Sequence, residues 1–349
     1  MTMRFATDVL GRRAIGAITA VAAAAAAIGL AASATAASAA PTARIPSGNP
    51  RAAAASSQCD QLDFISVRGS GQPYKGATDM SVSPETDAVL TGIRDQLKAD
   101  GVTETIAVDQ LPYKAVSDDL LTAGLKFPAS AIGAIKTIVT DWHQLMDVNL
   151  PRYISDEEQG ESELNTYLAQ LYGSCQSAAQ QPMVVLAGYS QGSMVIHNVL
   201  NAIAGTGQTG LMSMIKGAVL IADPERMKSS VVPNAGNAPW GDYGLCHALD
   251  VLIIPHSRTR DSCAPPGTTK DVAKYFKDVA YQVCEKDDLA CDTSGLLELN
   301  SHAVPSLTSL LHFKKELKLG ETVHATGYSG SEVVAVGSLI ARNLVADGL

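Results

Sequence analysis

The sequence predicts an α/β protein built on a central, mainly parallel β-sheet, and three observations support this fold class. Residues 183–187 and 217–222 are uninterrupted apolar runs, the composition expected of strands that are covered on both faces. Amphipathic helical patterns alternate with strand-like runs along the chain, which is typical of a parallel sheet flanked by helices. A Gly-x-Ser-x-Gly turn at residues 188–192 joins the first apolar run to the helical pattern that follows it.

The first half of the chain supplies two of the predicted strands. Residues 62–67 are rich in β-branched and aromatic side chains and end at a glycine-containing turn signal. Residues 84–100 place their apolar side chains on one helical stripe, and a glycine follows as a stop signal. Residues 105–108 are the second strand-like run, and helical patterns then cover residues 118–148 and 162–172.

The second half of the chain continues the alternation. A helical pattern over residues 194–203 follows the serine-containing turn, and further strand-like runs occur at 250–255 and 279–283. An amphipathic pattern over residues 331–345 predicts the last helix. Since no internal repeat or linker interrupts residues 58–349, we expect one domain there.

The N-terminal segment has the pattern of an export signal. Three arginines precede an alanine-rich apolar run over residues 14–32, and small residues suited to cleavage stand at 37–39. We therefore predict a signal peptide over residues 1–39, a flexible linker over 40–57 and a secreted protein. An uncleaved membrane anchor is the alternative, and the adjacent arginine pair leaves both the Sec and the twin-arginine export routes open.

Composition and charge exclude several classes of function. Hydrophobic residues make up 46% of the chain and charged residues 17%, which is typical of a globular protein with a sizeable core. The net charge of -9 argues against a nucleic-acid partner, because phosphate binding requires clustered lysine and arginine. No cysteine and histidine cluster has the spacing of zinc ligands, and we expect neither a metal nor another cofactor.

Six cysteines follow the predicted leader, an even number that is typical of disulfide-bonded exported proteins. Spacing alone does not exclude other pairings. It favours a short loop closed by Cys284 and Cys291, a local pair of Cys246 with Cys263, and a long-range pair of Cys59 with Cys175.

Ser190, at the centre of the glycine-bounded turn, is the candidate nucleophile. A serine hydroxyl attacks only when it is exposed and has a base beside it. A tight turn between strand and helix exposes the hydroxyl, and the helix N-terminus behind it offers N–H groups to an oxyanion. The bare pentapeptide occurs by chance, but the apolar strand before it and the apolar helix after it favour a nucleophile over a structural turn.

A nucleophile of this type requires an acid and a histidine later in the chain. His143 precedes the serine, and His197 lies in the helix directly behind it, where we expect a surface or core role. The acids in loops after predicted strands are Asp223, Asp287 and Asp288. The residues alone leave the choice of acid and base open.

Four blocks of the sequence resemble the cutinase family of secreted esterases. The Gly-Tyr-Ser-Gln-Gly turn is the usual nucleophile turn of that family, and the acidic loop between two cysteines is equally characteristic. The resemblance implies an α/β-hydrolase fold, which is a three-layer sandwich around the sheet, and a Ser-His-Asp esterase mechanism. The four blocks are residues 64–70, 188–192, 217–224 and 284–291.

The resemblance also implies the acid and the base. In the family the acid lies three residues before the second cysteine of the loop, which corresponds to Asp288 rather than Asp287 or Asp223. The base is assigned to His324, which stands just before the last predicted helix. His302 is the alternative, because it follows the disulfide loop more closely.

The resemblance further implies the oxyanion donors. They are the backbone N–H of Gln191 and both the N–H and the hydroxyl of Ser70, which follows the first predicted strand. In the implied mechanism His324 takes the proton of Ser190 while Asp288 holds the imidazole.

Substrate and partners are less closely defined. The resemblance implies esters of fatty acids, including lipids, and contact with a lipid surface. Relative to compact cutinases, the chain carries extra residues near 114–160, 228–275 and 292–322. Residues 124–146 are apolar enough to form either a lid over the site or a helix packed on the core. The alanine-rich composition favours an actinobacterial member, and the resemblance implies that such relatives often act on lipids of the cell envelope. One rival interpretation is a thioesterase, phospholipase or peptidase of the same fold, and the other is a non-catalytic secreted antigen or adhesin. The sequence leaves open the acyl length of the substrate and the oligomeric state of the protein.

Overall fold

A computed structural model describes residues 59, 62–73, 82–103, 105–115, 150–175, 181–226, 232–239, 244–246, 276–294 and 307–349. All of them belong to one structural unit, Arg51–Leu349. The predicted signal peptide, the predicted linker, the expected helix at 118–148, the expected strand at 250–255 and His302 lie outside the described residues.

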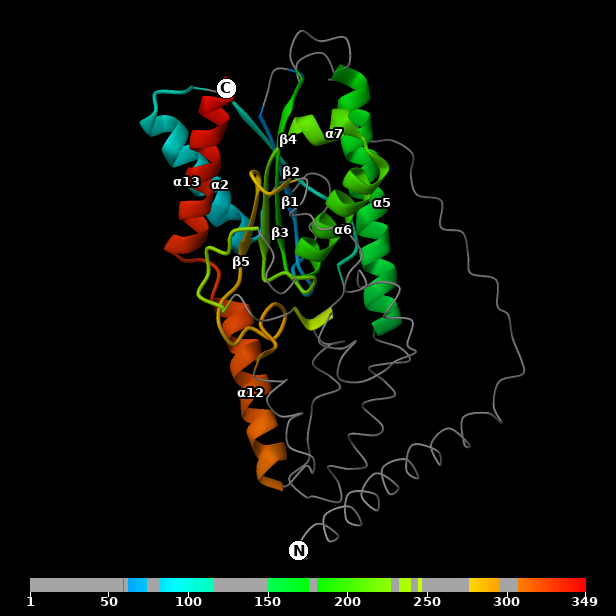
Figure 1. The fold of residues 1–349 in the computed structure, drawn as a ribbon, viewed down its shortest axis with the longest axis vertical. Coiled ribbons are helices and arrows are strands. Elements are labelled where there is room, and N and C mark those ends of the chain that lie inside the picture. The colour runs from blue at the N-terminus through cyan, green and yellow to red at the C-terminus, as the bar shows by residue number, and fades with distance from the viewer. Residues whose placement is uncertain are drawn as a thin grey trace, which may run out of the picture. The chain divides into compact units, whose positions relative to one another are not determined.

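Within the described residues, the central sheet has five parallel strands in the order β2-β1-β3-β4-β5 (Figure 1). Nearly all side chains of β1, β3 and β4 are buried, because helices cover both faces of the sheet. This double burial explains why these strands are continuous apolar runs in the sequence, and it confirms the predicted fold class. The strands are β1 (Leu62–Val67), β2 (Ile106–Gln110), β3 (Met183–Tyr189), β4 (Ile215–Ile221) and β5 (Ala280–Val283).

Apart from α12, the described helices form the two outer layers (Figure 1). One layer contains α2 and α13, which pack on each other and share an apolar cluster with Phe64 and Val185. The other layer contains α5, α6 and α7, whose cluster includes Ile65 and Leu186. Successive strand residues belong to opposite clusters because their side chains point to opposite faces. The helices are α2 (Pro84–Ala99), α5 (Leu150–Cys175), α6 (Gln191–Thr206), α7 (Thr209–Met214), α12 (Leu307–Thr326) and α13 (Ser331–Ala346).

Most predicted elements agree with the observed ones within a few residues, but two helices differ. The helix expected over 162–172 is the much longer α5, which runs through Gly160 and Gly173. Gly160 does not stop this helix; it fits close packing, since a Cβ there would lie 2.8 Å from Val195. Helix α12 was not expected as a continuous helix, and it occupies the second half of the segment 292–322, which departs from the family pattern.

Disulfide bonds join parts of the described chain as the spacing predicts. Cys59 pairs with Cys175, which ties the chain just before β1 to the end of α5. Cys284 pairs with Cys291 and closes the loop that follows β5. Cys246 is also disulfide-bonded, and its expected partner Cys263 lies outside the described residues. Of the helices that the structure describes, none is long and apolar enough to span a membrane.

The strand order places two predicted site residues at a natural crevice. The chain leaves β1 for β2 on one side and later returns to β3 on the other side of β1. The loops after β1 and β3 therefore diverge at the carboxyl edge of the sheet, where ligands bind in open α/β folds. Ser70 follows β1 and Ser190 follows β3, so both lie at this position.

Candidate active site

Ser190 occupies a strained turn between β3 and α6. Its φ of 53° lies in the left-handed region, which residues other than glycine rarely adopt. The flanking glycines permit the turn: a Cβ on Gly192 would lie 2.1 Å from the carbonyl oxygen of Val67, and one on Gly188 2.6 Å from the backbone of Gly192. This close approach of strand and helix matches the geometry of a nucleophile elbow, which raises the serine above the sheet.

Hydrogen bonds from β4 hold the turn in place. The backbone N–H of Ser190 donates to the carbonyl of Ile221 over 2.8 Å. The hydroxyl oxygen of Ser193 lies 2.7 Å from both the Ile221 and the Gly188 carbonyl oxygens. These contacts to β4 and to the end of β3 help to offset the unfavourable backbone conformation at Ser190.

The structure brings Ser190, His324 and Asp288 together in one hydrogen-bonded line. His324 Nε2 lies 2.9 Å from the Ser190 hydroxyl oxygen. Its Nδ1 lies 3.0 and 3.1 Å from the two carboxylate oxygens of Asp288. The Asp288 side chain is fully buried, whereas 24% of the His324 side chain is exposed. In this arrangement the imidazole can accept the serine proton while the carboxylate orients it.

The disulfide loop after β5 turns Asp288 toward the histidine. Asp287 has a φ of 68°, a left-handed conformation that reverses the chain just before the acid. One Asp288 carboxylate oxygen accepts a 2.7 Å hydrogen bond from the backbone N–H of Ala290. The Cys284–Cys291 disulfide closes the loop around this turn, which restricts the positions that the carboxylate can take.

Helix α12 delivers His324 in its last turn. The sequence places this histidine just ahead of the last helix, and the structure agrees, since α13 follows α12 closely. Gly320, one turn earlier, lies against the disulfide loop: a Cβ there would come within 2.3 Å of Leu289 Cγ and 2.9 Å of the Asp287 carbonyl oxygen. The missing side chain at Gly320 therefore lets α12 approach the loop that carries the acid.

Two tyrosines that the sequence analysis did not single out contact this pair. The Tyr189 hydroxyl donates to the His324 carbonyl oxygen over 2.5 Å, and its ring stacks on the imidazole with centroids 5.0 Å apart. The Tyr328 hydroxyl donates to the Asp288 carboxylate. Both are close in sequence to the predicted residues, one directly before the serine and the other four residues after the histidine, and that proximity was the available signal.

The predicted oxyanion residues are linked to each other and to α5. The Ser70 hydroxyl donates to the Gln191 side-chain oxygen over 3.3 Å, and the Gln191 side-chain nitrogen donates to the Tyr153 carbonyl over 3.0 Å. In this arrangement the single hydrogen of the Ser70 hydroxyl points to Gln191. The backbone N–H groups of Ser70 and Gln191 are then the candidate donors.

The turn after β1 is braced by Arg68 and Tyr113. An Arg68 guanidinium nitrogen donates to the Tyr113 carbonyl, and the Tyr113 hydroxyl donates back to the Arg68 carbonyl. A second guanidinium nitrogen donates to the Gln72 carbonyl over 2.6 Å. Burial raises the pKa of Tyr113 far above its ordinary value, so its hydroxyl stays a donor. Ser70 therefore lies in a turn with a fixed backbone.

Comparison with known proteins identifies the family. A model of the cutinase family matches residues 58–308. The chain belongs to the cutinase family. Two cutinases from Hypocrea jecorina are 28% identical to it over 118 residues, a match that covers 31% of this chain and 44% of theirs. The match thus spans less than half the length of those relatives.

Solved structures of similar proteins include two esterase-type neighbours of this cutinase-family chain. A cutinase-like protein from Cryptococcus sp. is 17% identical, with a TM-score of 0.37 over 78% of this chain and 97% of that one. An acetylxylan esterase is 16% identical, with a TM-score of 0.38 over 78% of this chain and all of that one. The family match includes Ser70, Ser190 and Asp288 but ends before His324, so the position of the base depends on the hydrogen bonds described above.

This cutinase-family chain has a second histidine and aspartate pair behind the nucleophile turn. His197 Nδ1 lies 2.7 Å from a carboxylate oxygen of Asp223, and both side chains are buried. The other Asp223 carboxylate oxygen accepts from the backbone N–H of Glu225 over 3.0 Å. Asp223 thus contacts His197 of α6 rather than His324, and it links α6 to the turn after β4.

A buried acid lies between α5 and α6. Glu157, on α5, accepts a 2.9 Å hydrogen bond from the Asn198 side chain of α6. Burial and the neighbouring Glu161 carboxyl raise the pKa of Glu157 to about 10. The acid is therefore neutral at physiological pH, one helical turn from the Tyr153 carbonyl that accepts from Gln191.

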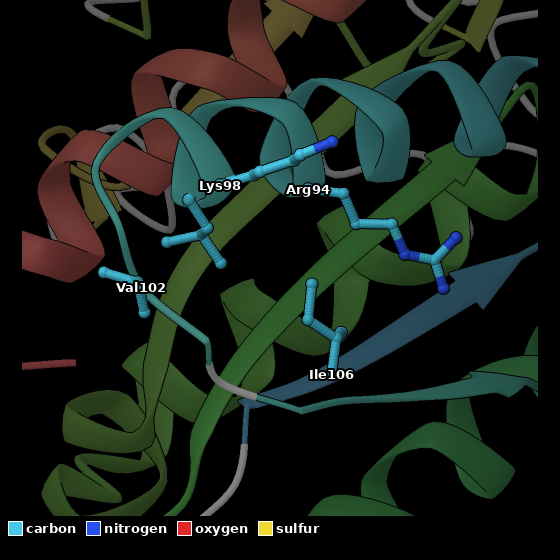
Figure 2. A pocket seen from close by; sticks show the side chains of 5 residues that line it. Arg94, Lys98, Val102 and Ile106 are labelled. Carbon is cyan, nitrogen blue, oxygen red and sulfur yellow. The ribbon is translucent and has the colours of Figure 1, made fainter.

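Figure 2 shows a hollow that is remote from these residues. It lies between the end of α2 and the start of β2, at the amino edge of the sheet, whereas Ser190 lies at the carboxyl edge. Within the described parts of this cutinase-family chain, no group of three or more histidine, cysteine or acidic side chains could hold a metal ion. The residues around the hollow are Arg94, Leu97, Lys98, Val102 and Ile106.

Proposed function

We propose that this protein is a secreted serine esterase that hydrolyses carboxylic esters of fatty acids. Ser190 is the nucleophile, His324 the general base and Asp288 the acid that orients it. The observation that carries the proposal is the hydrogen-bonded line from the buried carboxylate through the imidazole to the serine, at the carboxyl edge of the sheet. Membership in the cutinase family supports the same reaction class.

The reaction proceeds by acyl transfer in two steps. As the Ser190 oxygen attacks the ester carbonyl carbon, His324 Nε2 takes its proton and the carbonyl oxygen becomes an oxyanion held by the N–H groups of Ser70 and Gln191. The imidazolium then gives that proton to the departing alcohol, and an acyl-enzyme remains. In the second step His324 takes a proton from the water that attacks the acyl carbon. The imidazolium then returns this proton to the Ser190 oxygen as the acyl bond breaks, so that the free acid leaves and the serine hydroxyl is restored.

Burial of Asp288 favours its role beside the imidazole. The carboxylate cannot be reached by solvent, so its charge acts on the protonated His324 in a medium of low dielectric constant. The partly exposed His324 faces the crevice that Ser190 also faces, which is where an ester would enter. Asp288 thus stabilises the imidazolium that forms in both steps.

Secretion completes the proposal. The disulfide bonds support an oxidising compartment, and the apolar, alanine-rich leader with small residues at its end supports export. Sequencing the N-terminus of the protein recovered from culture medium tests this, and we expect it to begin after residue 39. A protein retained in the cytoplasm with an intact leader would contradict secretion.

The catalytic proposal is tested with Ser190→Ala against a series of p-nitrophenyl esters from acetyl to palmitoyl. We expect the wild type to hydrolyse them and to be labelled by a fluorophosphonate probe, and the variant to do neither. The matched control is Ser338→Ala, which removes a partly buried serine hydroxyl from α13, where it contacts the Gly92 and Val334 carbonyls and not the site. This variant should keep full activity. Turnover or labelling that survives in Ser190→Ala would contradict the proposal.

The rival activities are separated by the same assay format. Acyl-thioesters, phospholipid vesicles and peptide substrates replace the p-nitrophenyl esters, and the ratio of kcat/KM values identifies the preferred bond. A folded wild type that neither reacts with the probe nor hydrolyses any of these substrates would favour a non-catalytic antigen or adhesin.

A further inference from the structure

Tyr328 occupies a buried position beside the acid, and the mechanism above does not use it. It lies in the short connection between α12 and α13, and only 1% of it is exposed. Its hydroxyl contacts one carboxylate oxygen of Asp288 and accepts a 3.0 Å hydrogen bond from the backbone N–H of Glu285. A tyrosine hydroxyl in this environment is positioned to act on the acid rather than on substrate.

The direction of these hydrogen bonds is fixed by chemistry. A tyrosine hydroxyl has one hydrogen to donate. The Glu285 N–H can only donate, so it occupies a lone pair of the hydroxyl oxygen, and the ionised Asp288 can only accept. The hydroxyl hydrogen therefore points to the carboxylate.

Asp288 consequently has donors on both of its oxygens. One oxygen accepts from the Ala290 N–H, the other accepts from the Tyr328 hydroxyl, and His324 Nδ1 lies within 3.1 Å of both. With both oxygens held, the carboxylate cannot rotate away from the imidazole. The hydroxyl also takes up part of the negative charge that would otherwise act on His324.

We propose that Tyr328 is a positioning residue of the active site, whose hydroxyl fixes the Asp288 carboxylate and sets the pH range in which His324 acts as a base. The inference rests on the proposed function, since it assumes that Asp288 and His324 work on Ser190. It predicts that a change confined to the Tyr328 hydroxyl alters catalysis although that hydroxyl touches no reacting atom.

The groups around Tyr328 favour the protonated form of its hydroxyl, so the hydroxyl remains a hydrogen-bond donor over the pH range of the assays. Burial and the charge of Asp288 raise the pKa of Tyr328 well above its ordinary value, so the hydroxyl keeps its hydrogen. Burial and the acidic side chains of Glu332 and Asp288 likewise raise the pKa of Glu285. The ionisable groups around the hydroxyl and its carboxylate are His324 from α12, Tyr189 from β3, Glu285 and Asp292 from the disulfide loop, and Glu332 from the start of α13.

The test is the Tyr328→Phe variant, with activity expressed per site labelled by a fluorophosphonate. We expect kcat to fall about ten- to a hundredfold with KM nearly unchanged, because a hydrogen bond to a charged group is lost. We also expect the acid limb of the kcat/KM profile to move up by about half a pH unit, because the full carboxylate charge then stabilises protonated His324.

The matched control is Tyr281→Phe. Tyr281 is also largely buried, on β5, and its hydroxyl accepts a 3.1 Å hydrogen bond from the Asn343 side chain, away from the acid. This variant should keep the wild-type profile even if it loses some stability. A shift shared by both variants would overturn the proposal, because it would show a general effect of removing a buried hydroxyl.

A second substitution removes any dependence on how well the phenylalanine variant folds. Tyr328→3-fluorotyrosine keeps the shape and makes the hydroxyl a stronger donor, so the acid limb should move to lower pH, opposite to the phenylalanine variant. If neither substitution moves the profile and Tyr328→Phe keeps kcat within twofold, the proposal is wrong. If Ser190→Ala itself stays active, the proposed function has failed instead.

Discussion

The two halves of the candidate site are built in different ways. The oxyanion half, Ser70 and Gln191, lies in turns that directly follow the paired strands β1 and β3, where Val67 pairs with Gly188. The base half, Asp288 and His324, lies in no strand. It is held by a disulfide loop, the end of α12 and two tyrosine hydroxyls.

The geometry of the oxyanion half is thus fixed mainly by the backbone, and that of the base half mainly by side chains. The oxyanion half takes its geometry from sheet hydrogen bonds and buried turns, which most side-chain substitutions leave intact. The base half depends on individual side chains that hold one another within hydrogen-bonding distance. Substitutions of comparable size should therefore cost more catalysis in the base half than in the oxyanion half.

The largest expected contrast is between His324→Ala and Ser70→Ala. Loss of the base should lower kcat by about 10⁴-fold or more, because the serine is no longer deprotonated as it attacks. Ser70→Ala keeps the backbone N–H and removes a hydroxyl that donates to Gln191, so a loss of about tenfold is expected. Initial rates on p-nitrophenyl butyrate measure both. A Ser70→Ala defect as deep as that of His324→Ala would show that the hydroxyl turns toward the oxyanion.

The two described disulfides should separate stability from activity. Their cysteines are 116 and 7 residues apart, so loop entropy predicts losses in the free energy of unfolding of about 5 kcal/mol for Cys59–Cys175 and about 2 kcal/mol for Cys284–Cys291. Replacing each pair by alanine and following urea unfolding measures this order. The Cys284–Cys291 variant should nevertheless lose more kcat, because that loop carries Asp288. Equal kcat in the two folded variants would contradict the assignment.

Glu157→Gln should change how stability depends on pH. Because the pKa of Glu157 is raised from 4.5 to about 10, its neutral form contributes stability that is complete below about pH 4.5 and declines as pH rises toward 10. The amide keeps the shape and cannot ionise, so the variant should nearly match wild type near pH 5 and be more stable by several kcal/mol near pH 9. Thermal unfolding across this range measures it. The exposed Glu158→Gln on the same helix is the control, and a gain there of the same size would contradict burial as the cause.

Tyr189→Phe should have the smallest effect. The ring that stacks on His324 stays, and only the hydroxyl that donates to the His324 carbonyl is removed. We expect kcat to fall about threefold to tenfold without a change in the pH profile, because that hydrogen bond orients the backbone and not the carboxylate. Steady-state rates across pH test this, and a shift of the acid limb as large as that in Tyr328→Phe would remove the distinction between the two tyrosines.

The strands were predictable because each carries its own signal. β1 has the expected bounds, and β3 and β4 differ only at their ends, since burial on both faces produces continuous apolar runs. The turn around Ser190 was also predictable from its two glycines, which strand and helix require in order to approach. These features are local, so a single sequence contains them.

The base half was harder to predict because tertiary contacts define it. Chain order and the family resemblance left His302 as an alternative to His324, and only the docking of α12 brings the latter to Ser190. The sequence offers only the closeness of Tyr328 to His324, since the effect of this tyrosine depends on the Asp288 carboxylate that folding places beside it. The direction of the Ser70 hydroxyl was likewise set by the buried Gln191 side chain, which the sequence does not place.

The contact between Gly320 and the disulfide loop bears on how relatives of this chain can diverge. Only the last two turns of α12 need to meet that loop for the imidazole to reach the serine. Residues can be inserted or deleted before Gly320 without changing this contact, because surface segments tolerate changes in length. His324 therefore keeps its position. Evolution can thus remodel the approach to the crevice, and with it the choice of ester, while the reacting groups stay where they are.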